Sequence, residues 1–264
     1  MSQVYVITSG KGGVGKTTTT ANLGAGLAMK DQKVVLVDTD IGLRNLDIVM
    51  GLENRIVYDL VDVIEGNCRL KQALIRDKRY PNLFLLPAAQ TKDKTAVHPE
   101  QMLKLTQSLR EYFDFVLIDC PAGIEQGFKN AVVGADNAIV VTVPEVSAVR
   151  DADRIIGLLN AYDITNPRLM INRFRPNMVK QGDMMDIEDT LEILGVELLG
   201  VVPDDELILR ASNLGEPVVN NMQSKAGQAF RNIVERLMGN EVPVMDLDVR
   251  AGFFAKLRQA FGGN

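Results

Sequence analysis

One short motif limits the fold of this 264-residue chain more than any other feature. Residues 10–17 read Gly-Lys-Gly-Gly-Val-Gly-Lys-Thr, which matches the pattern G-x-x-x-x-G-K-S/T. An apolar run at residues 4–7 precedes the motif, and a helix-compatible segment at residues 18–29 follows it. Glycines let consecutive backbone N–H groups turn toward phosphate oxygens, and the following helix presents its positive end to them. The sequence therefore predicts a strand, a phosphate-binding loop and a helix, in that order.

Further apolar runs alternate with helix-length segments along the whole chain. These runs are apolar on both faces, as in strands of a parallel sheet that is covered by helices on each side. They lie at residues 4–7, 34–37, 83–86, 115–118, 138–141, 169–171 and 198–202. Between them, residues 146–161 and 224–238 place apolar side chains at helical spacing. The alternation predicts an α/β protein: a three-layer α-β-α P-loop NTPase fold with a mostly parallel, doubly wound sheet.

Composition, together with residues that are typical of helix ends, indicates one main domain with an appendage. Hydrophobic residues make up 46% and charged residues 24% of the chain, which excludes a disordered or collagen-like protein. Gly239 and Asn240 are typical of a helix end, and Pro243 discourages another helix. We expect a P-loop domain at residues 1–239, a linker at 240–250 and a tail at 251–264.

Cysteine content and hydropathy bear on the cellular compartment. Cys68 and Cys120 are too few and too far apart for a disulfide framework or a four-ligand metal site. No apolar stretch approaches the ~18 to 20 residues of a spanning helix, and the N-terminus lacks the layout of a signal peptide. We therefore expect a cytoplasmic protein that crosses no membrane.

Acidic residues end two of the predicted strands. Asp38 and Asp40 follow the run at 34–37, and Asp119 follows the run at 115–118. Ligands bind beyond the carboxyl ends of the strands in an open α/β sheet, so these acids should face the phosphate loop. Asp119 is typical of a Walker B aspartate that holds Mg²⁺ through water. Asp38 would support the metal shell, or would simply form the turn, and Asp40 would orient an attacking water.

The loop residues complete this predicted site. Lys16 should reach the β- and γ-phosphates of ATP, and Thr17 should bind Mg²⁺ through its hydroxyl. The chemistry expected is in-line attack of water on the γ-phosphorus, catalysed mostly by positioning and charge neutralisation, and slow without a partner. The residues predicted to hold the nucleotide in the loop are Gly10, Lys11, Gly12, Gly13, Val14, Gly15, Lys16, Thr17 and Thr18.

The second lysine of the loop, Lys11, gives it the form that resembles the deviant Walker A loop of the MinD/ParA group of ATPases. Residues 40–47, 144–154 and 210–217 extend this resemblance essentially from end to end. It implies a sandwich dimer formed with ATP, in which Lys11 reaches the partner's phosphates as an arginine finger does. It also implies that segments following two later strands hold the adenine base, through Asn172, Pro203 and Asp205.

The C-terminal tail has the pattern of a short membrane-surface helix. At about 100° per residue, its phenylalanines and leucine share one face, with basic residues beside them. The residues of this predicted membrane-binding helix are Phe253, Phe254, Lys256, Leu257, Arg258 and Phe261. A terminal helix docked on the body is the alternative. One such tail should bind an anionic membrane weakly, whereas two tails held together in a dimer should bind far better.

The resemblance also implies a cellular function. Division-site ATPases of this group bind the inner face of the plasma membrane as ATP dimers, recruit the division inhibitor MinC, and are stimulated and released by MinE. A peripheral position on the cytoplasmic face of the inner membrane follows from the resemblance. So do partner contacts at four charged residues, for each of which an exposed charge on a helix is the simpler alternative: Arg44, Glu53, Asp151 and Asp153.

Several other classes share parts of this pattern. A ParA-type partition ATPase works on DNA, but residues 1–249 carry 26 basic and 34 acidic residues, which disfavours a nucleic-acid surface. We therefore expect no specific nucleic-acid partner. A flagellar-number regulator of the same group typically has an extension before its first strand, which here begins by Val4. An iron–sulfur carrier would need paired cysteines, and a P-loop kinase would form a phosphorylated product.

Overall fold

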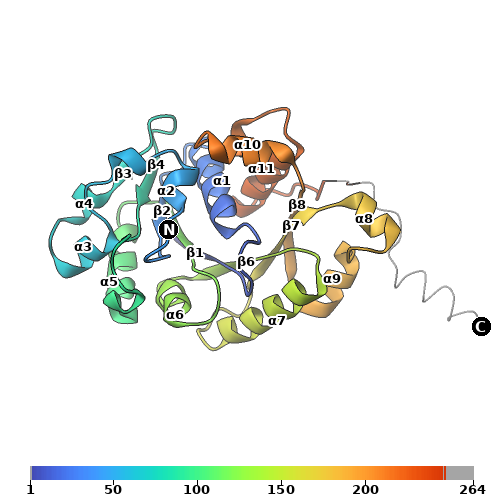
Figure 1. Ribbon diagram of the computed structural model, residues 1–264, viewed down its shortest axis with the longest axis horizontal. Coiled ribbons are helices and arrows are strands. Elements are labelled where there is room, and N and C mark those ends of the chain that lie inside the picture. The colour runs from blue at the N-terminus through green and yellow to red at the C-terminus, as the bar shows by residue number, and fades with distance from the viewer. Residues whose placement is uncertain (1, 246, 248–264) are drawn as a thin grey trace, which may run out of the picture.

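An eight-stranded sheet forms the centre of the computed structural model, which describes residues 2–245 and 247 (Figure 1). Its strand order is β3-β4-β2-β5-β1-β6-β7-β8, and all neighbouring strands are parallel except β3 and β4. The strands are β1 (Gln3–Thr8), β2 (Val34–Asp38), β3 (Ile75–Arg76), β4 (Leu83–Leu86), β5 (Phe115–Asp119), β6 (Asn137–Thr142), β7 (Arg168–Phe174) and β8 (Glu197–Pro203). Every predicted apolar run coincides with a strand, so the three-layer α/β fold is confirmed. The two-residue antiparallel strand β3 was not predicted.

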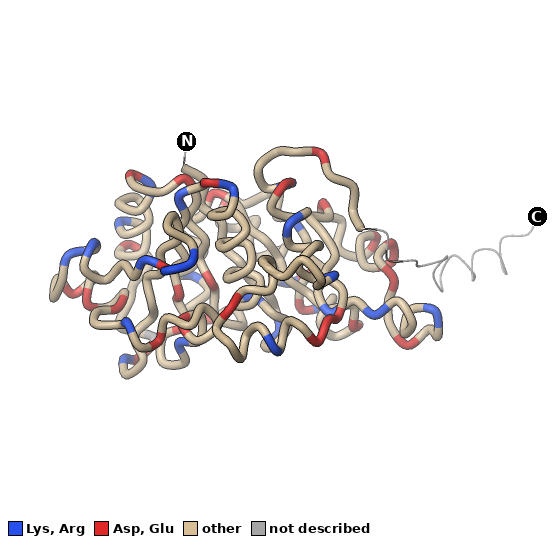
Figure 2. Tube along the Cα trace, turned by 90° about the horizontal axis from the view of Figure 1, so that it is seen from above, with Lys and Arg blue, Asp and Glu red and all other residues tan. Residues whose placement is uncertain are grey.

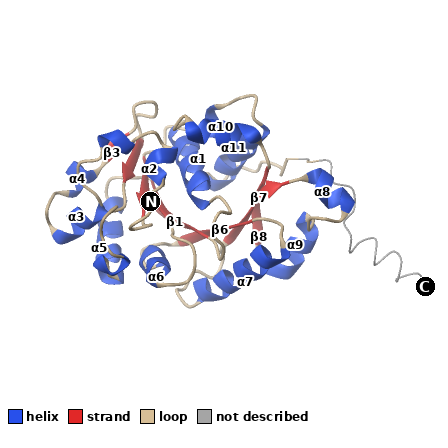
Figure 3. Cartoon of the chain, in the orientation of Figure 1, coloured by secondary structure: helices blue, strands red, loops and turns tan. Residues whose placement is uncertain are grey.

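Helices cover both faces of the sheet (Figure 3). Buried or half-buried side chains of α1, α2, α10 and α11 belong to the core on one face, and those of α3, α4, α5, α6, α7 and α9 to the core on the other. The α-helices are α1 (Lys16–Ala28), α2 (Leu46–Val49), α3 (Leu60–Glu65), α4 (Leu70–Ala73), α5 (Pro99–Arg110), α6 (Gln126–Val132), α7 (Val146–Asn160), α8 (Pro176–Gln181), α9 (Ile187–Leu194), α10 (Glu206–Asn213) and α11 (Lys225–Leu237). Short 3-10 helices lie at Glu53–Arg55, Lys94–Ala96 and Val218–Asn220.

The two cores explain why the strand sequences are apolar throughout. In β1, Val4 and Val6 pack into one core, whereas Tyr5 and Ile7 pack into the other. Successive side chains of a strand point to opposite faces of a sheet, so a strand with a helical layer on each side needs apolar residues at every position.

The connections of the chain place its candidate site beside β1. Strands β2 to β5 lie on one side of β1, and β6 to β8 lie on the other. The order in which the chain adds strands to the sheet therefore reverses at β1. At such a switch point, the carboxyl end of the strand opens into the crevice where α/β proteins bind ligands. The loop that leaves β1 at this point is the predicted phosphate loop, residues 10–17.

The predicted membrane-binding tail at residues 251–264 lies outside the described residues. Within the described part of the chain, no helix is long and apolar enough to span a bilayer. Lys and Arg positions are interspersed with Asp and Glu positions in the view of Figure 2. The predicted division into residues 1–239, 240–250 and 251–264 stays a prediction, although α11 does end at Leu237.

Two helical glycines allow a test of how closely α1 packs on the sheet. A Cβ at Gly24 would collide with Cδ2 of Leu36, a fully buried residue of β2, whereas a Cβ at Gly157 of α7 would meet nothing within 4 Å. Alanine stabilises a helix relative to glycine by ~0.5–1 kcal/mol, but overpacking a core costs ~1–3 kcal/mol. We expect Gly157→Ala to raise the free energy of unfolding by about 0.5–1 kcal/mol and Gly24→Ala to lower it by about 1–2 kcal/mol in urea denaturation. Equal stabilisation by both substitutions would contradict the close packing of α1 on β2.

Candidate functional site

The loop between β1 and α1 holds its lysine in a buried position. Gly13 and Gly15 have φ angles of 75° and 102°, which glycine adopts without strain, and Gly15 directly precedes α1. Lys16 is 8% exposed, and its Nζ donates a hydrogen bond to Oγ of Ser9 at 2.9 Å. The Ser9 hydroxyl donates in turn to the carbonyl of Lys11 at 2.7 Å. Burial lowers the pKa of Lys16, and the nearby Asp119 carboxylate opposes that shift. The ammonium group is thus already ordered within the loop, where it can contact a phosphate.

Asn172, at the carboxyl-end half of β7, packs against this loop. A Cβ at Gly15 would collide with Nδ2 of Asn172, and this Nδ2 donates to the carbonyl of Val14 at 2.8 Å. Asn172 is 4% exposed, and its Oδ1 has no hydrogen-bond partner. The glycine at position 15 is therefore required by space as well as by its φ angle. The contact of Asn172 with an adenine base stays a prediction.

Two buried carboxyl groups lie at the carboxyl ends of neighbouring strands. Asp38 of β2 and Asp119 of β5 occupy facing register positions and are 1% and 3% exposed. Burial raises the pKa of Asp38 to about 8, and the charge of Asp119 adds to this shift. Burial likewise raises the pKa of Asp119 to about 6, against hydrogen bonds from the hydroxyls of Thr17 and Thr20. The pair therefore resists carrying two negative charges near neutral pH in the absence of a compensating cation.

Asp38 also organises the loop that follows β2. Its Oδ1 accepts the backbone N–H of Asp40 at 2.9 Å, and its Oδ2 accepts the backbone N–H of Leu46 at 3.2 Å. Across the strand ends, Thr39 donates from its hydroxyl to the carbonyl of Asp119 at 2.6 Å. Asp38 thus performs the turn-forming role that its position allowed, while its role in a metal shell stays a prediction. The loop brings Asp40, which is half-buried, near Lys16 and Asp119.

The donor set at this edge fits a magnesium ion bound together with a nucleotide. No cluster of three or more His, Cys, Asp or Glu side chains suited to a metal occurs among the described residues. Mg²⁺ prefers oxygen ligands and is usually held by one or two carboxylates together with phosphates and water. Asp119 and the Thr17 hydroxyl in contact with it supply such oxygens next to the phosphate loop. Two buried carboxyl groups with raised pKa values are also the environment that a divalent cation stabilises.

Lys11, by contrast, lies at the surface of the loop. Its side chain is 41% exposed, and its Nζ contacts Oε2 of Glu145 at 3.0 Å and Oγ of Ser147 at 3.3 Å. The start of α7 is pressed against the loop here, because a Cβ at Gly10 would collide with the backbone of Asp151. Exposed ion pairs contribute only ~0–1 kcal/mol, so Lys11 can exchange Glu145 for another anion at little cost.

Sequence reasoning missed several residues of this site. Ser9 and Thr20 contact Lys16 and Asp119, and Glu145 and Ser147 contact Lys11. Ser9 directly precedes the motif, and Thr20 ends the run of threonines at residues 17–20, so the hydroxyl residues around the motif were an available signal. Glu145 and Ser147 are about 135 residues away from the loop, and no spacing rule connects them to it.

The remaining predicted site residues lie at scattered positions. Thr18 is in the first turn of α1 and is half-buried, and Pro203 is the buried last residue of β8. Asp205 begins α10: its Oδ1 accepts from the N–H of Leu207 at 2.9 Å, and its Oδ2 accepts from the hydroxyl of Ser224 at 2.7 Å. Burial would raise the pKa of Asp205, but these hydrogen bonds outweigh it and lower the pKa.

The four predicted partner-binding residues also differ in their surroundings. Arg44 has a φ angle of 33° and pairs through Nε with Oδ2 of Asp47 at 2.9 Å. Glu53 and Asp153 are exposed, and Asp151 is half-buried beside the phosphate loop. Their roles in partner binding stay predictions.

A cavity of about 780 Å³ opens at the same edge of the sheet, where β7 and β8 end. Its lining includes Phe174, Arg175, Pro203, Asp204 and Ser224. Cavities of ~300–1,000 Å³ accommodate small ligands, so this edge has room for the base of a nucleotide whose phosphates occupy the loop.

Comparisons with known proteins agree with this geometry. Residues 5–218 match the family model of the CobQ/CobB/MinD/ParA nucleotide binding domain. The chain is 58% identical over 265 residues to the septum site-determining protein MinD of Bacillus subtilis, covering 99% of each chain. The MinC:MinD cell division protein complex of Aquifex aeolicus contains a chain similar in structure, with a TM-score of 0.87 and 46% identity over 92% of this chain and 99% of that one. Septum site-determining protein MinD of Pyrococcus horikoshii, complexed with Mg-ADP, has a TM-score of 0.83 and 32% identity over 90% of this chain and 96% of that one.

The raised pKa of Asp38 predicts how stability depends on pH. An unfolded aspartate loses its proton near pH 4, whereas folded Asp38 retains it up to about pH 8. Between these values the folded state binds more protons than the unfolded state. The free energy of unfolding of the nucleotide-free protein should therefore fall as pH rises from 5 to 8, by at most ~1.4 kcal/mol per pH unit from this one group. We expect Asp38→Asn to flatten the slope between pH 6.5 and 8 in urea denaturation.

Asp189 provides the control for this experiment. Burial, and then the nearby Asp186, raises the pKa of Asp189 on α9 to about 6, so its contribution to the slope ends near that pH. Asp189→Asn should change the slope below about pH 6 and leave the range from 6.5 to 8 as it is. A slope in that upper range that survives Asp38→Asn would show that another group is responsible.

Proposed function

The chain belongs to the CobQ/CobB/MinD/ParA nucleotide-binding family and, within it, to the septum site-determining MinD proteins, and on this premise we propose that it is an ATPase of division-site placement. The observation that supports this function best is the pairing of a complete phosphate loop with a second, surface-exposed lysine in that loop. Lys16 is buried and ordered on Ser9, while Lys11 is exposed. The two lysines are thus equipped for different tasks, Lys16 for phosphates bound in its own loop and Lys11 for a phosphate that faces the loop from outside.

Within one protomer, the proposed reaction is hydrolysis of ATP to ADP and phosphate. Lys16 and the backbone N–H groups of the loop bind the phosphates, and Asp40 orients the attacking water. Thr17 and Asp119 would hold Mg²⁺, which neutralises charge on the β- and γ-phosphates when bound. The Mg-ADP complex of the Pyrococcus horikoshii relative supports this choice of ligands. The cavity lined by Pro203 and Asp204, together with Asn172, would take the base.

Between two protomers, the proposed role of Lys11 is to act in trans. Its pairing with Glu145 is exposed on both sides, with 41% and 57% of the side chains accessible. A γ-phosphate on a facing protomer is a stronger anion than one carboxylate, so ATP would draw Lys11 across the dimer interface. Hydrolysis would remove that attraction and separate the protomers.

The proposed cellular role joins this cycle to a membrane and to a division inhibitor. The ATP dimer would bind the cytoplasmic face of the inner membrane through the tails at residues 251–264 and would recruit MinC. The MinC:MinD complex of Aquifex aeolicus supports that partnership. MinE is the proposed partner that stimulates hydrolysis and release, and residues Arg44, Glu53, Asp151 and Asp153 are the proposed contacts.

Co-sedimentation with vesicles tests the membrane part of this proposal. The full chain and a version ending at Val249 should be compared with vesicles of phosphatidylglycerol and phosphatidylethanolamine in ATP, in ADP and without nucleotide. We expect only the full chain with ATP to sediment, because one tail binds weakly and the dimer makes the second insertion effectively intramolecular. Equal sedimentation of the truncated chain, or no sedimentation of the full chain in ATP, would contradict a tail-anchored dimer.

Substitution of the exposed lysine tests the trans mechanism. Lys11→Ala should lower the rate of phosphate release from ATP, measured with vesicles present, by ~10³-fold or more, the effect of losing an arginine finger. It should leave the melting temperature nearly unchanged, because the ion pair with Glu145 is exposed. Lys104→Ala, which removes an exposed lysine from α5, is the matched control and should keep full activity. Unaltered turnover by the Lys11 variant would rule out a catalytic role for this residue.

A further inference from the structure

The chain reverses direction after α11 and runs back along the sheet. Gly239 has a φ angle of 87°, its N–H donates to the carbonyl of Arg236 at 3.1 Å, and the N–H of Asn240 donates to the carbonyl of Glu235 at 3.0 Å. These bonds end the helix and turn the backbone. We call residues 239–247 the strap; of these, residues 239–245 and 247 are described.

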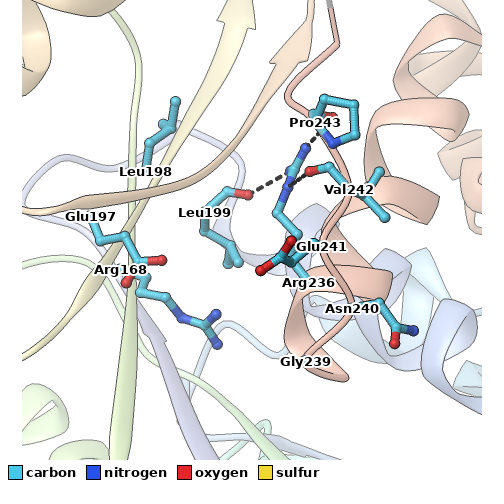
Figure 4. Close-up of a pocket in the computed structure, with 10 residues that line it drawn as sticks. All are labelled: Arg168, Glu197, Leu198, Leu199, Arg236, Gly239, Asn240, Glu241, Val242 and Pro243. Atoms are coloured by element: carbon cyan, nitrogen blue, oxygen red, sulfur yellow. Dashed lines mark hydrogen bonds between the residues drawn. The ribbon is translucent and has the colours of Figure 1, made fainter.

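A single guanidinium group fastens the strap to the body (Figure 4). Arg236 donates from Nε to the carbonyl of Val242 at 2.7 Å and from Nη2 to the carbonyl of Pro243 at 2.6 Å. Its Nη1 donates to the carbonyl of Leu199 in β8 at 2.7 Å. One side chain from α11 therefore holds two strap carbonyls and one carbonyl of the edge strand, in the fixed fork geometry of arginine.

The edge strand is shaped to receive this group. Leu169 pairs with Leu198 but Met170 pairs with Gly200, so Leu199 is the extra residue of a β-bulge. A Cβ at Gly200 would lie 3.1 Å from Nη1 of Arg236 and closer still to Ile233. The bulge and the glycine thus leave the carbonyl of Leu199 and the space beside it available to the guanidinium.

The strap runs along β7 and β8 from the amino ends of these strands to their carboxyl ends. Residues 239–243 line a cavity of about 550 Å³ together with Arg168 and Glu197, the first residues of β7 and β8. Met245 and Leu247 line the 780 Å³ cavity with Phe174 and Pro203, the last residues of the same strands. The strap therefore carries the chain from the end of α11 to the carboxyl ends of the strands, the side of the sheet on which the phosphate loop lies.

Apolar contacts complete the attachment at that edge. Met245 packs against the core that contains α1 and α11, whereas Leu247 packs against the core on the opposite face of the sheet. Since β8 is the last strand, these contacts place the strap around the side of the sheet, touching both helical layers.

We propose that the strap, fastened by Arg236, sets the point from which the membrane tail leaves the body, which makes Arg236 a positioning residue for membrane attachment. This inference rests on the tail-anchored dimer proposed above. A free linker would let the tail depart from the end of α11, a helix about 20 Å long that runs away from the phosphate edge. The strap instead delivers both tails of a dimer at the edge that faces the partner, with only residues 248–250 between strap and tail.

The expected effect of releasing the strap follows from chain length. Without the fastening, each tail would be joined by the whole of residues 240–250, roughly eleven residues instead of three. The effective concentration of a tethered group falls roughly as the −3/2 power of the tether length. We therefore expect Arg236→Ala to weaken ATP-dependent vesicle binding by about 5- to 10-fold. Arg236→Lys, whose single ammonium cannot reach three carbonyls together, should lie between Arg236→Ala and the wild type.

The control variant is on the same helix. Arg231 also donates to backbone carbonyls, at 2.6 Å to Val219 and 3.3 Å to Asn221, but it donates to none of the described strap residues. Arg231→Ala should therefore cost similar packing without loosening the strap. The two alanine variants are compared for thermal stability, ATP turnover without vesicles, and sedimentation with vesicles of phosphatidylglycerol and phosphatidylethanolamine in ATP.

A membrane-free measurement follows the strap itself. Spin labels on Val244→Cys and Asn177→Cys, both exposed positions, report the distance between strap and α8. The background is Cys68→Ser, while Cys120 is buried with its pKa raised to about 12 and will not react. We expect a narrow distance distribution in the parent chain and after Arg231→Ala, and a broad one after Arg236→Ala.

The outcomes separate this inference from the function on which it rests. A parent chain that ignores the vesicles in ATP overturns the membrane function and the inference together. ATP-dependent binding by the parent chain with equal binding by Arg236→Ala, or a distance distribution that Arg236→Ala leaves narrow, overturns the inference alone. An equal loss of vesicle binding in Arg231→Ala would assign the effect to general destabilisation and would also overturn it.

Discussion

The central constraint on this structure is a pair of buried carboxyl groups that cannot both ionise without a cost in free energy. Asp38 and Asp119 are forced together because β2 and β5 are neighbouring parallel strands whose ends lie in register. Each is buried, and each is held by hydrogen bonds from groups that the fold fixes: backbone N–H groups for Asp38 and threonine hydroxyls for Asp119. The fold therefore retains an electrostatic cost that a bound cation would relieve. Binding energy gained in this way is available to order the loop that Asp38 holds, residues 39–46.

The phosphate loop holds one of its lysines buried near these acids and the other at the surface. Lys16 is buried near Asp119, and its Nζ is held by Oγ of Ser9. Lys11 is too exposed for its ion pair to fix it strongly. A phosphate in the loop would therefore find Lys16 already buried within the loop, whereas recruitment of Lys11 would depend on what faces the loop from outside.

Sequence patterns predicted the parts of the molecule that depend on local order. The apolar runs predicted every long strand, because burial on both faces leaves a continuous signal, and the loop motif predicted the position of Lys16. The two-residue strand β3 is too short to leave a pattern. The contacts of Lys11 with Glu145, of Asn172 with Val14 and of Arg236 with Leu199 were not predicted, because they join residues far apart in sequence. The contacts of Arg236 with Val242 and Pro243 are closer in sequence, but their acceptors are backbone carbonyls, which leave no sequence pattern. The sequence assigned different expected roles to Asp119 and Asp38, but it did not give the threonine hydroxyl that bonds Asp119 or the two loop N–H groups that bond Asp38.

The path of the strap explains how one event at the phosphates could control membrane attachment without a change inside the body. In the proposed sandwich dimer the phosphate edges of two protomers would face each other, because each Lys11 would have to reach the opposite nucleotide. Tails that leave at these edges are brought together by the same contact that brings the nucleotides together, whereas tails that left at the ends of α11 would each start about 20 Å farther away. Because two short tails would bind a membrane far better than one, separation of the proposed dimer after hydrolysis would by itself be enough to release them. On the proposed function, the geometry of the strap would make dimerisation and membrane attachment a single equilibrium, and Arg236 would determine how tightly the two are linked.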